Sequence, residues 1–362
     1  MAQTISASDT EVLKPINAVF QQQFLRQAAV HCPYMTGTKP SALQKFQGAA
    51  TAKWRRVGAI TPSTTALGEL TGNAAYGQGR DSVVTSNTDV TATLAKYGQY
   101  ILLSEEAEYF NPKQQKSEII DSLAIAGGRS LNMLQRDIVD DNATVKYVGA
   151  AAAANQIVLP FTKEAVDSVI LTLVGNNAMP FNATSRTDDT VGSASILPSF
   201  WGFCHPHVSY DIKRLPGFKS VETYANHTRT VQGEFGMLEG SVLGVRFVYC
   251  TDATLDADAG GSLGSTGLRS TGGTSVDVYT TAIYGKEALG SVGLGSPHTD
   301  GAYTVRGMES LPENIEIYEV GRQATVADPF KELAMMSYKF WHAGSVLNSA
   351  WGRVIKSSAT NV

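Results

Sequence analysis

Alternating hydrophobic and polar positions on either side of a long polar segment predict two extended β-strands. The first runs through TAKWRRVGAI (51–60), and the second through VVTSNTDVTATLAKYGQYILLS (83–104), where β-branched residues recur. The segment between them, 61–82, is rich in Gly, Thr, Ala and Asn and has few large apolar side chains. Two strands joined in this way are only marginally stable alone in water. We therefore expect the hairpin to lie on its own domain or on a neighbouring molecule.

The spacing of apolar residues predicts a long helix over residues 113–142. Its apolar positions recur every three or four residues, at Ile120, Leu123, Leu131, Leu134 and Ile138, with Glu118, Arg129, Arg136 and Asp137 off that stripe. A helix of about 30 residues is ~45 Å long, far above the ~12-residue mean. Gly127 and Gly128 in its middle are costly for a helix and indicate close backbone packing or a bend.

Shorter elements complete a mixed body. We predict amphipathic helices over 15–29, with Pro15 in the first turn, and over 161–177, where Thr162 serves as the cap. An extended arm follows the first helix, and 199–218 reads as a buried strand that enters a short helix. Further strands are predicted within 236–253, 276–295, 313–321 and 328–358. The Gly/Ser/Thr-rich segment 256–275 predicts a flexible surface loop. The fold class is α+β.

Composition adds modest constraints. The chain has 362 residues, 43 % of them hydrophobic and only 17 % charged. This excludes an intrinsically disordered chain. The net charge of −4 lacks the basic excess of a protein that grips nucleic acid. The N-terminal segment lacks the pattern of a secretory signal, no apolar run of 18 residues predicts a membrane span, and three scattered cysteines exclude a disulfide framework.

Candidate chemistry is sparse. CHPH brings Cys204, His205 and His207 together, but a metal site needs three or four ligands, and a fourth is missing. The Gly-rich stretch 260–273 lacks the Lys of a phosphate-binding loop. Glu105, Glu106 and Glu108 form an acidic group at a strand end, which we interpret as a solvated or subunit-contacting face. We interpret Phe340, Trp341 and Trp351 as core residues. No catalytic, metal or cofactor site is predicted, and the chain is not expected to be an enzyme.

One basic cluster stands out on the first hairpin strand. Lys53, Arg55 and Arg56 flank Trp54, and strand alternation places Arg55 on the face opposite Trp54 and Arg56. Such a cluster fits either DNA or the carboxylates of a neighbouring subunit. Because the whole chain is not basic, we favour carboxylates. We take as candidate inter-subunit contacts Lys53, Arg55, Arg56, Glu69, Arg80, Asp81, Glu105 and Glu106.

Five segments, in order, carry a resemblance to a known family. They are KWRRVGAITPSTTALGELTG (53–72), VTATLAKYGQYILLSE (90–105), FWGFCHPHVSYDIKRLPGF (200–218), GEFGMLEGSVLGVRFV (233–248) and DPFKELAMMSYKFWHAGSVLNSAWGRVIKSSA (328–359). Together they are similar to the N4-gp56 family of major capsid proteins. The order of elements resembles the HK97-like fold of tailed-phage major capsid proteins.

The resemblance implies a division of the chain. Residues 1–50 correspond to an N-terminal arm and 51–100 to the E-loop, a hairpin that lies over an adjacent subunit. Residues 101–147 correspond to the peripheral domain with its spine helix, and 148–302 to the axial domain. Residues 303–362 return through the peripheral domain, and the last strand is expected to rejoin the axial domain.

The implied function is that of a major capsid protein. Hexamers and pentamers of this chain would form the icosahedral head around double-stranded DNA, bound without sequence specificity. The location is the virion, with assembly in the host cytoplasm. A separate scaffolding protein, a portal and a decoration protein are the expected kinds of partner. The alternatives are an encapsulin-like cargo cage of the same fold and a hydrolase that uses His205 and His207.

Some shells of this fold carry an isopeptide bond from an E-loop lysine. Residues 54–95 contain no lysine. We therefore expect no such crosslink and a monomer band in boiling SDS.

Overall fold

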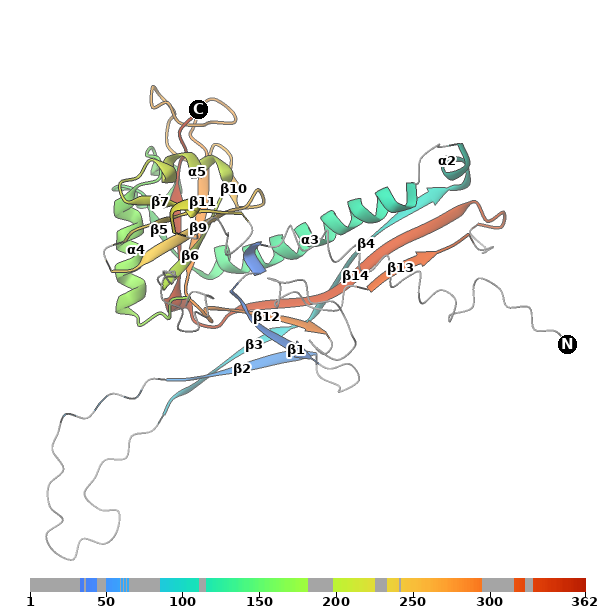
Figure 1. The fold of residues 1–362 in the computed structure, drawn as a ribbon, viewed down its shortest axis with the longest axis horizontal. Coiled ribbons are helices and arrows are strands. Elements are labelled where there is room, and N and C mark those ends of the chain that lie inside the picture. Colours follow the sequence, from blue (N-terminus) through green and yellow to red (C-terminus); the bar gives the residue numbers. More distant parts are fainter. Residues whose placement is uncertain are drawn as a thin grey trace, which may run out of the picture.

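The computed structural model describes residues 33–35, 37–43, 50–58, 60, 62, 64, 85–110, 115–181, 198–224, 233–240, 242–294, 316–322 and 328–362. The described chain has three parts (Figure 1). A compact part holds a large sheet, an elongated part holds one long helix beside long strands, and a hairpin leaves the junction between them. The predicted helix 15–29 lies outside the described residues.

The compact part is built on an eight-stranded sheet with the order β5-β15-β11-β6-β9-β8-β7, and β10 pairs with β11. Its strands are β5 (Thr144–Tyr147), β6 (Ser199–Cys204), β7 (Phe218–Ser220), β8 (Glu234–Leu238), β9 (Gly244–Tyr249), β10 (Leu255–Asp256), β11 (Val278–Tyr284) and β15 (Gly352–Ser357). The last strand, β15, lies between β5 and β11, so the chain returns at its end to the sheet it built earlier.

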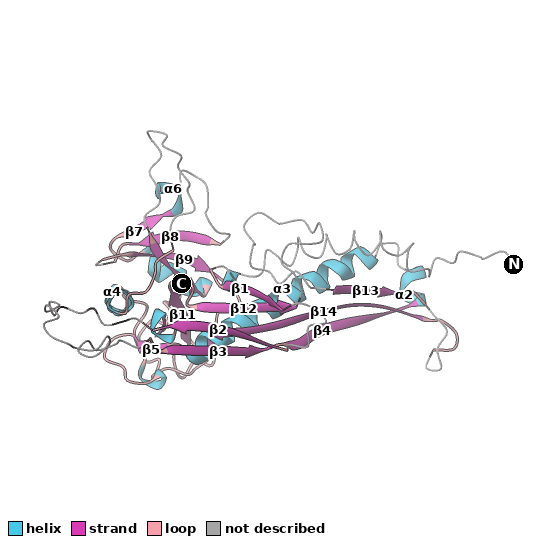
Figure 2. Ribbon diagram, turned by 90° about the horizontal axis from the view of Figure 1, so that it is seen from below, coloured by secondary structure: helices cyan, strands magenta, loops and turns pink. Residues whose placement is uncertain are grey.

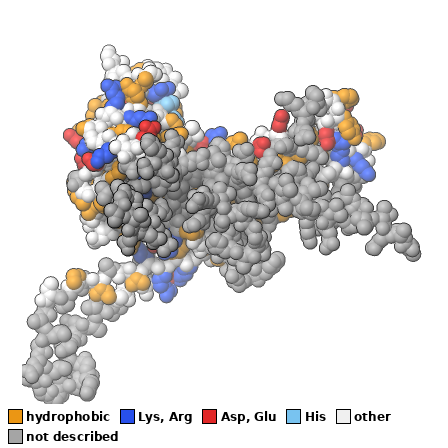
Figure 3. Space-filling view, viewed as in Figure 1, with side chains coloured by type: hydrophobic (Ala, Val, Ile, Leu, Met, Phe, Trp, Pro, Cys, Tyr) orange, Lys and Arg blue, Asp and Glu red, His pale blue; other side chains and the backbone are white. Residues whose placement is uncertain are grey.

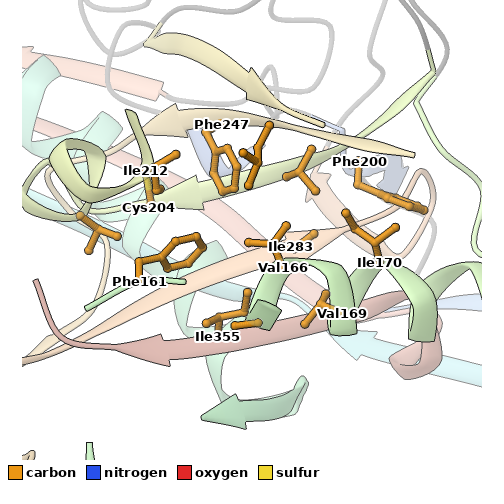
Figure 4. Close-up of a cluster of buried hydrophobic side chains, with 14 of the residues drawn as sticks. Phe161, Val166, Val169, Ile170, Phe200, Cys204, Ile212, Phe247, Ile283 and Ile355 are labelled. Atoms are coloured by element: carbon orange, nitrogen blue, oxygen red, sulfur yellow. The ribbon is translucent and has the colours of Figure 1, made fainter. Parts of the chain in front are cut away.

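Helices and apolar side chains bury this sheet. β6 and β11 are buried at every position. Helices α4 (Lys163–Gly175), α5 (Pro206–Lys213) and α6 (Val221–Tyr224) accompany the sheet. Figure 4 shows Val166 and Ile170 of α4 directed at the sheet side chains Phe247 and Ile283, with which they form one apolar core. The amphipathic helix predicted over 161–177 is confirmed, whereas Thr162 at its N-cap makes no side-chain capping bond.

The elongated part combines α3 with a five-stranded sheet. α3 (Gln115–Asn142) runs for 28 residues, about 42 Å. The sheet has the order β1-β12-β14-β13, with β4 also paired to β14. Its strands are β1 (Lys39–Leu43), β4 (Ala95–Ser104), β12 (Leu289–Leu294), β13 (Glu316–Val320) and β14 (Leu333–Val346). One face of it packs Met336, Tyr338 and Phe340 against Ile120, Leu123 and Leu131 of α3. The long helix predicted for 113–142 is confirmed.

Helix α3 packs tightly against β14 at Gly344. A Cβ atom placed there would lie 2.4 Å from Cδ1 of Ile138 and 2.7 Å from Oε1 of Gln135. We expect Gly344→Val to push the helix away from the strand and to lower the free energy of unfolding by about 1–3 kcal/mol. Gly321→Ala is the control, because a Cβ there meets nothing within 4 Å. Equal urea midpoints for the two variants would refute this close packing.

The hairpin has strands β2 (Thr51–Val57) and β3 (Asn87–Thr93), paired only with each other among the described strands. Its root is not free. Ala52 and Ala92 are buried in a small cluster with Val292 and Ala343 of β12 and β14. Figure 1 shows β2 and β3 extending past this contact, away from the elongated part. The hairpin therefore lies on its own chain at the root.

The Gly-rich segment 256–275 departs from the flexible loop that its composition predicts. The buried carboxylate of Asp277 accepts hydrogen bonds from the backbone N–H groups of Asp258 and Thr271, both at 3.0 Å. Leu268 is 6 % exposed and forms a bridge with Thr360 near the end of the chain. The segment is thus held by Asp277, which lies just after it, and by backbone contacts with the end of the chain.

Candidate functional site

The eight candidate contact residues fall into three groups. Lys53, Arg55 and Arg56 lie on β2, at the root of the hairpin, while Glu105 and Glu106 begin the short helix α2 (Glu105–Phe110) at the far end of the elongated part. Figure 3 shows Lys and Arg side chains gathered at the hairpin root and hydrophobic side chains gathered near α2. The other three candidates, Glu69, Arg80 and Asp81, lie outside the described residues.

The outward face of the hairpin carries a charged triplet of Lys53, Arg55 and Asp89. Arg55 pairs with Asp89 across the strands, with Nε 3.0 Å from Oδ1, and Nζ of Lys53 lies 2.6 Å from Oδ2. The bonds from Lys53 and Arg55 lower the pKa of the Asp89 carboxyl. Both cationic side chains are more than half exposed, at 54 % and 62 %. The triplet therefore presents one net positive charge to whatever approaches this face.

Arg56 lies on the opposite face, as alternation predicts. Its Nη1 donates to Oδ1 of Asn348 at 2.8 Å, which ties the hairpin to the segment between β14 and β15. Beside this contact is a cleft of about 600 Å³ between the hairpin and the compact part. Its walls include Trp54, Val57, Met179 and Trp351. Arg56, although exposed, thus belongs to an intrachain joint, while Lys53 and Arg55 lie on the outward face of β2.

The acidic helix α2 has an internal partner. Arg322 lies 2.5 Å from Oε2 of Glu108 and 3.5 Å from Oε1 of Glu105, and its guanidinium lies 4.8 Å from the centre of the Tyr109 ring. Glu105 is therefore partly used within the chain, while Glu106 is exposed. The same end of the molecule exposes large hydrophobic side chains, with Tyr109 68 %, Phe110 84 % and Phe330 80 % accessible.

The β4–β14–β13 sheet has a second face, which points away from α3 (Figure 2). Tyr100 and Leu102 of β4 are 63 % and 52 % exposed on it. Trp341 of β14 lies on this face, with the Lys96 ammonium 6.0 Å from its ring centre. Trp341 was expected in the core, and this placement corrects that expectation: strand alternation gives the buried position to Phe340 and turns Trp341 outward.

The Cys-His segment forms ordinary structural contacts. Cys204 is completely buried. Nδ1 of His207 lies 2.9 Å from the Tyr279 hydroxyl, and the ring of His205 lies 4.4 Å from that of His207. Burial and the neighbouring His207 lower the pKa of His205 to about 4. Across the described ranges, no three His, Cys, Asp or Glu side chains are grouped as a metal site requires.

None of the helices in the described parts of the chain combines the length and the apolar character that crossing a membrane requires.

Sequence comparisons return no relative. No protein-family model matches the chain, and no curated protein matches it in sequence. Membership in the N4-gp56 family therefore stays a prediction.

Structural comparisons return phage capsids along nearly the whole chain. The capsid protein of Ralstonia phage GP4 is 9 % identical with a TM-score of 0.59, over 100 % of this chain and 94 % of that one. The head protein of Helicobacter pylori bacteriophage KHP40 is 11 % identical with a TM-score of 0.53, over 91 % of each chain. The capsid protein of cyanophage P-SCSP1u is 12 % identical with a TM-score of 0.52, over 91 % and 89 %. The chain has the HK97-like fold of phage capsid proteins.

Proposed function

We propose that this chain is a major capsid protein that assembles into the icosahedral head of a tailed phage. The observation that carries the proposal is the similarity to the capsid protein of Ralstonia phage GP4 over the full length of the chain. Because identity is only 9 %, this similarity establishes the fold, and assembly is inferred from the fold together with the exposed surfaces. A structural protein without catalytic activity fits these surfaces.

Within this proposal, the three parts of the structure take the roles of capsid subdomains. The hairpin within 51–100 would be the E-loop, the elongated part with α3 the peripheral domain, and the compact part within 148–302 the axial domain. Residues 1–50 would be the N-terminal arm. The pairing of β4 with β14 supports a boundary between the E-loop and the peripheral domain near Leu94. The position of β15 in the large sheet supports its assignment to the axial domain.

Self-association would cover the surfaces that the single chain leaves open. The outward face of the hairpin offers Lys53 and Arg55, which fit carboxylates of a neighbouring subunit. The end that carries α2 offers Glu106 beside exposed Tyr109 and Phe110. Exposed apolar groups of this kind commonly mark interaction sites. Hexamers and pentamers would then be built from contacts among identical chains.

Other partners follow from the same role. The shell would enclose double-stranded DNA without sequence specificity, and the net charge of −4 suits a container from which DNA must leave. A scaffolding protein, a portal and a decoration protein would be separate chains. The location would be the virion, after assembly in the host cytoplasm. The five segments of resemblance make the N4-gp56 family the proposed family.

Charge reversal on the hairpin tests the proposed subunit contact. We expect Arg55→Glu to reduce the fraction of chain in sedimenting particles at least tenfold, because a glutamate would repel the neighbour's carboxylates. Lys219→Glu is the control, an exposed lysine on β7 with 50 % accessibility. The double variant Arg55→Glu with Asp89→Arg preserves an intrachain pair and should still assemble poorly. Particles from Arg55→Glu at the wild-type level would contradict the contact.

The same preparations distinguish a phage head from an encapsulin-like cargo cage. A phage head should sediment as closed shells, empty or with DNA. Copurification of a stoichiometric enzyme inside the particles would instead favour the cargo cage.

A further inference from the structure

The C-terminal half of α3 is joined to the compact part by polar contacts. Its partner is the segment 250–254, which leaves the large sheet after β9. Asp252 accepts hydrogen bonds from Nε and Nη2 of Arg129 at 2.8 and 2.6 Å, and Nη1 of Arg136 donates to its backbone carbonyl at 2.5 Å. Asn132, which is completely buried, donates to Sγ of Cys250 at 3.2 Å.

These helix residues share one face. Arg129, Asn132, Arg136 and Asp140 are spaced by three or four positions, which places them in one line along the helix. We call this line, together with residues 250–254, the polar seam. The apolar stripe of α3, with Ile120, Leu123 and Leu131, instead packs against the long strands. The same helix is thus held by apolar packing in the elongated part, and at the compact part by these hydrogen bonds together with the buried side chain of Val139.

Asp140 is the last residue of the seam and the least well satisfied. Its Oδ2 accepts the hydroxyl of Thr254 at 2.5 Å. Its Oδ1 is buried and has no hydrogen-bond partner among the described residues, and the same holds for the hydroxyl of Tyr34. An ionised carboxylate with a buried, unpaired oxygen is costly, whereas the neutral acid is tolerated.

The surrounding charges do not remove this cost. Arg136 and Asp137 face Asp140 from its own helix, Lys356 from β15 and Tyr34 from the segment 33–35. Arg136 is also bound to Asp137, and Lys356 lies 3.1 Å from Asp256, so each cation has another anion. Burial raises the pKa of Asp140 from 3.8 to about 6, although the Thr254 bond opposes the rise.

We propose that the polar seam is an acid-sensitive joint, tight when the Asp140 carboxyl is protonated and loosened when it is ionised. The elongated and compact parts would then change their relative orientation more readily at neutral pH than at mildly acidic pH. The joint belongs to the single chain and does not depend on shell formation, so its test can be read whether or not the protein assembles.

The direction of the pH effect follows from the protonation of Asp140 in the closed seam and in the open seam. A raised pKa in the folded chain means that the closed seam binds the proton more tightly than the open one. The stabilisation by the neutral acid is complete below about pH 4 and is lost as the pH rises through about 6. Above about pH 6, the whole difference between the pKa of Asp140 in the closed seam and its ordinary value raises the equilibrium constant for opening the seam about 100-fold.

Hydrogen exchange of the purified full-length chain tests this proposal. The amides of 250–256 and 137–147 are compared between wild type and Asp140→Asn at pH 5 and at pH 7.5. At each pH, the exchange rate of the wild type is divided by that of Asp140→Asn, which cancels the intrinsic pH dependence of amide exchange. We expect the wild-type rate relative to Asp140→Asn to rise about tenfold from pH 5 to pH 7.5. Asp141→Asn, which neutralises the adjacent exposed acid, should follow the wild type.

A ratio that is the same at both pH values would overturn the proposal. If Asp140→Asn does not fold, Thr254→Val supplies the test. The hydroxyl of Thr254 favours the ionised form of Asp140, so its removal should move the midpoint of the exchange profile to higher pH. A Thr254→Val profile that coincides with the wild type would equally overturn the proposal.

Discussion

A chain whose hairpin is cut short beyond Gly58 is expected to fold and to lose shell formation almost completely. The backbone N–H of Gly58 donates to the carbonyl of Ser86 at 2.7 Å, so the two strands are still paired there. An Asn-Gly turn can therefore replace residues 59–85 and close the hairpin. The root cluster of Ala52, Ala92, Val292 and Ala343 remains, and the fold should be retained. The variant thus removes residues 59–85 of the proposed E-loop and keeps the candidate contact residues Lys53 and Arg55.

Sedimentation and circular dichroism together measure this outcome. The expected result is a wild-type spectrum with less than a tenth of the wild-type particles. As a length-matched control, a chain with Glu69, Arg80 and Asp81 changed to Ala keeps the whole segment and tests its charged residues alone. Normal shells from the shortened chain would show that the hairpin is dispensable, and the proposed E-loop role would fail.

The second large effect is expected at Asp252. Its carboxylate is 3 % exposed and accepts hydrogen bonds from Arg129 and Asn132. Asp252→Ala leaves the amide of Asn132 with fewer partners in a buried place and frees Arg129 from its anion. We expect the free energy of unfolding to fall by about 2 kcal/mol, since half-exposed Arg129 can turn to solvent.

Asp256→Ala is the matched control for Asp252→Ala. Asp256 lies four residues farther on and pairs with Lys356 at 3.1 Å, with both side chains partly exposed. Such a pair contributes about 0–1 kcal/mol. Urea unfolding at neutral pH compares the two variants with the wild type. Equal midpoints for Asp252→Ala and Asp256→Ala would contradict the importance of the polar seam for stability.

Local pattern predicted the elements that depend on few distant partners. The helical period defined α3 to within two residues, because its apolar stripe is regular from Ile120 to Ile138. Strand alternation placed Arg55 opposite Trp54 and Arg56, since side-chain direction along a strand does not depend on what the strand contacts. Both predictions follow from backbone geometry alone.

Contacts between segments that are distant in sequence could not be predicted from the helical period or from strand alternation. Arg129 and Arg136 lie off the apolar stripe of α3 and look like solvent-facing residues, yet they bind Asp252, which is more than 110 positions away. Asp89 completes the hairpin triplet only through the register of β2 and β3, which the pattern does not define. The order of the Gly-rich segment likewise rests on Asp277, whose role a composition count cannot reveal.

Negative-stain electron microscopy of the purified chain, alone and with candidate scaffolding proteins, tests the proposed capsid role most directly. The expected images show closed shells, or rings of five and six subunits. A uniform monomer or small dimer under both conditions would contradict self-assembly while leaving the fold intact. It would make a screen for enzymatic activity, with His205 and His207 changed to Ala, the next experiment.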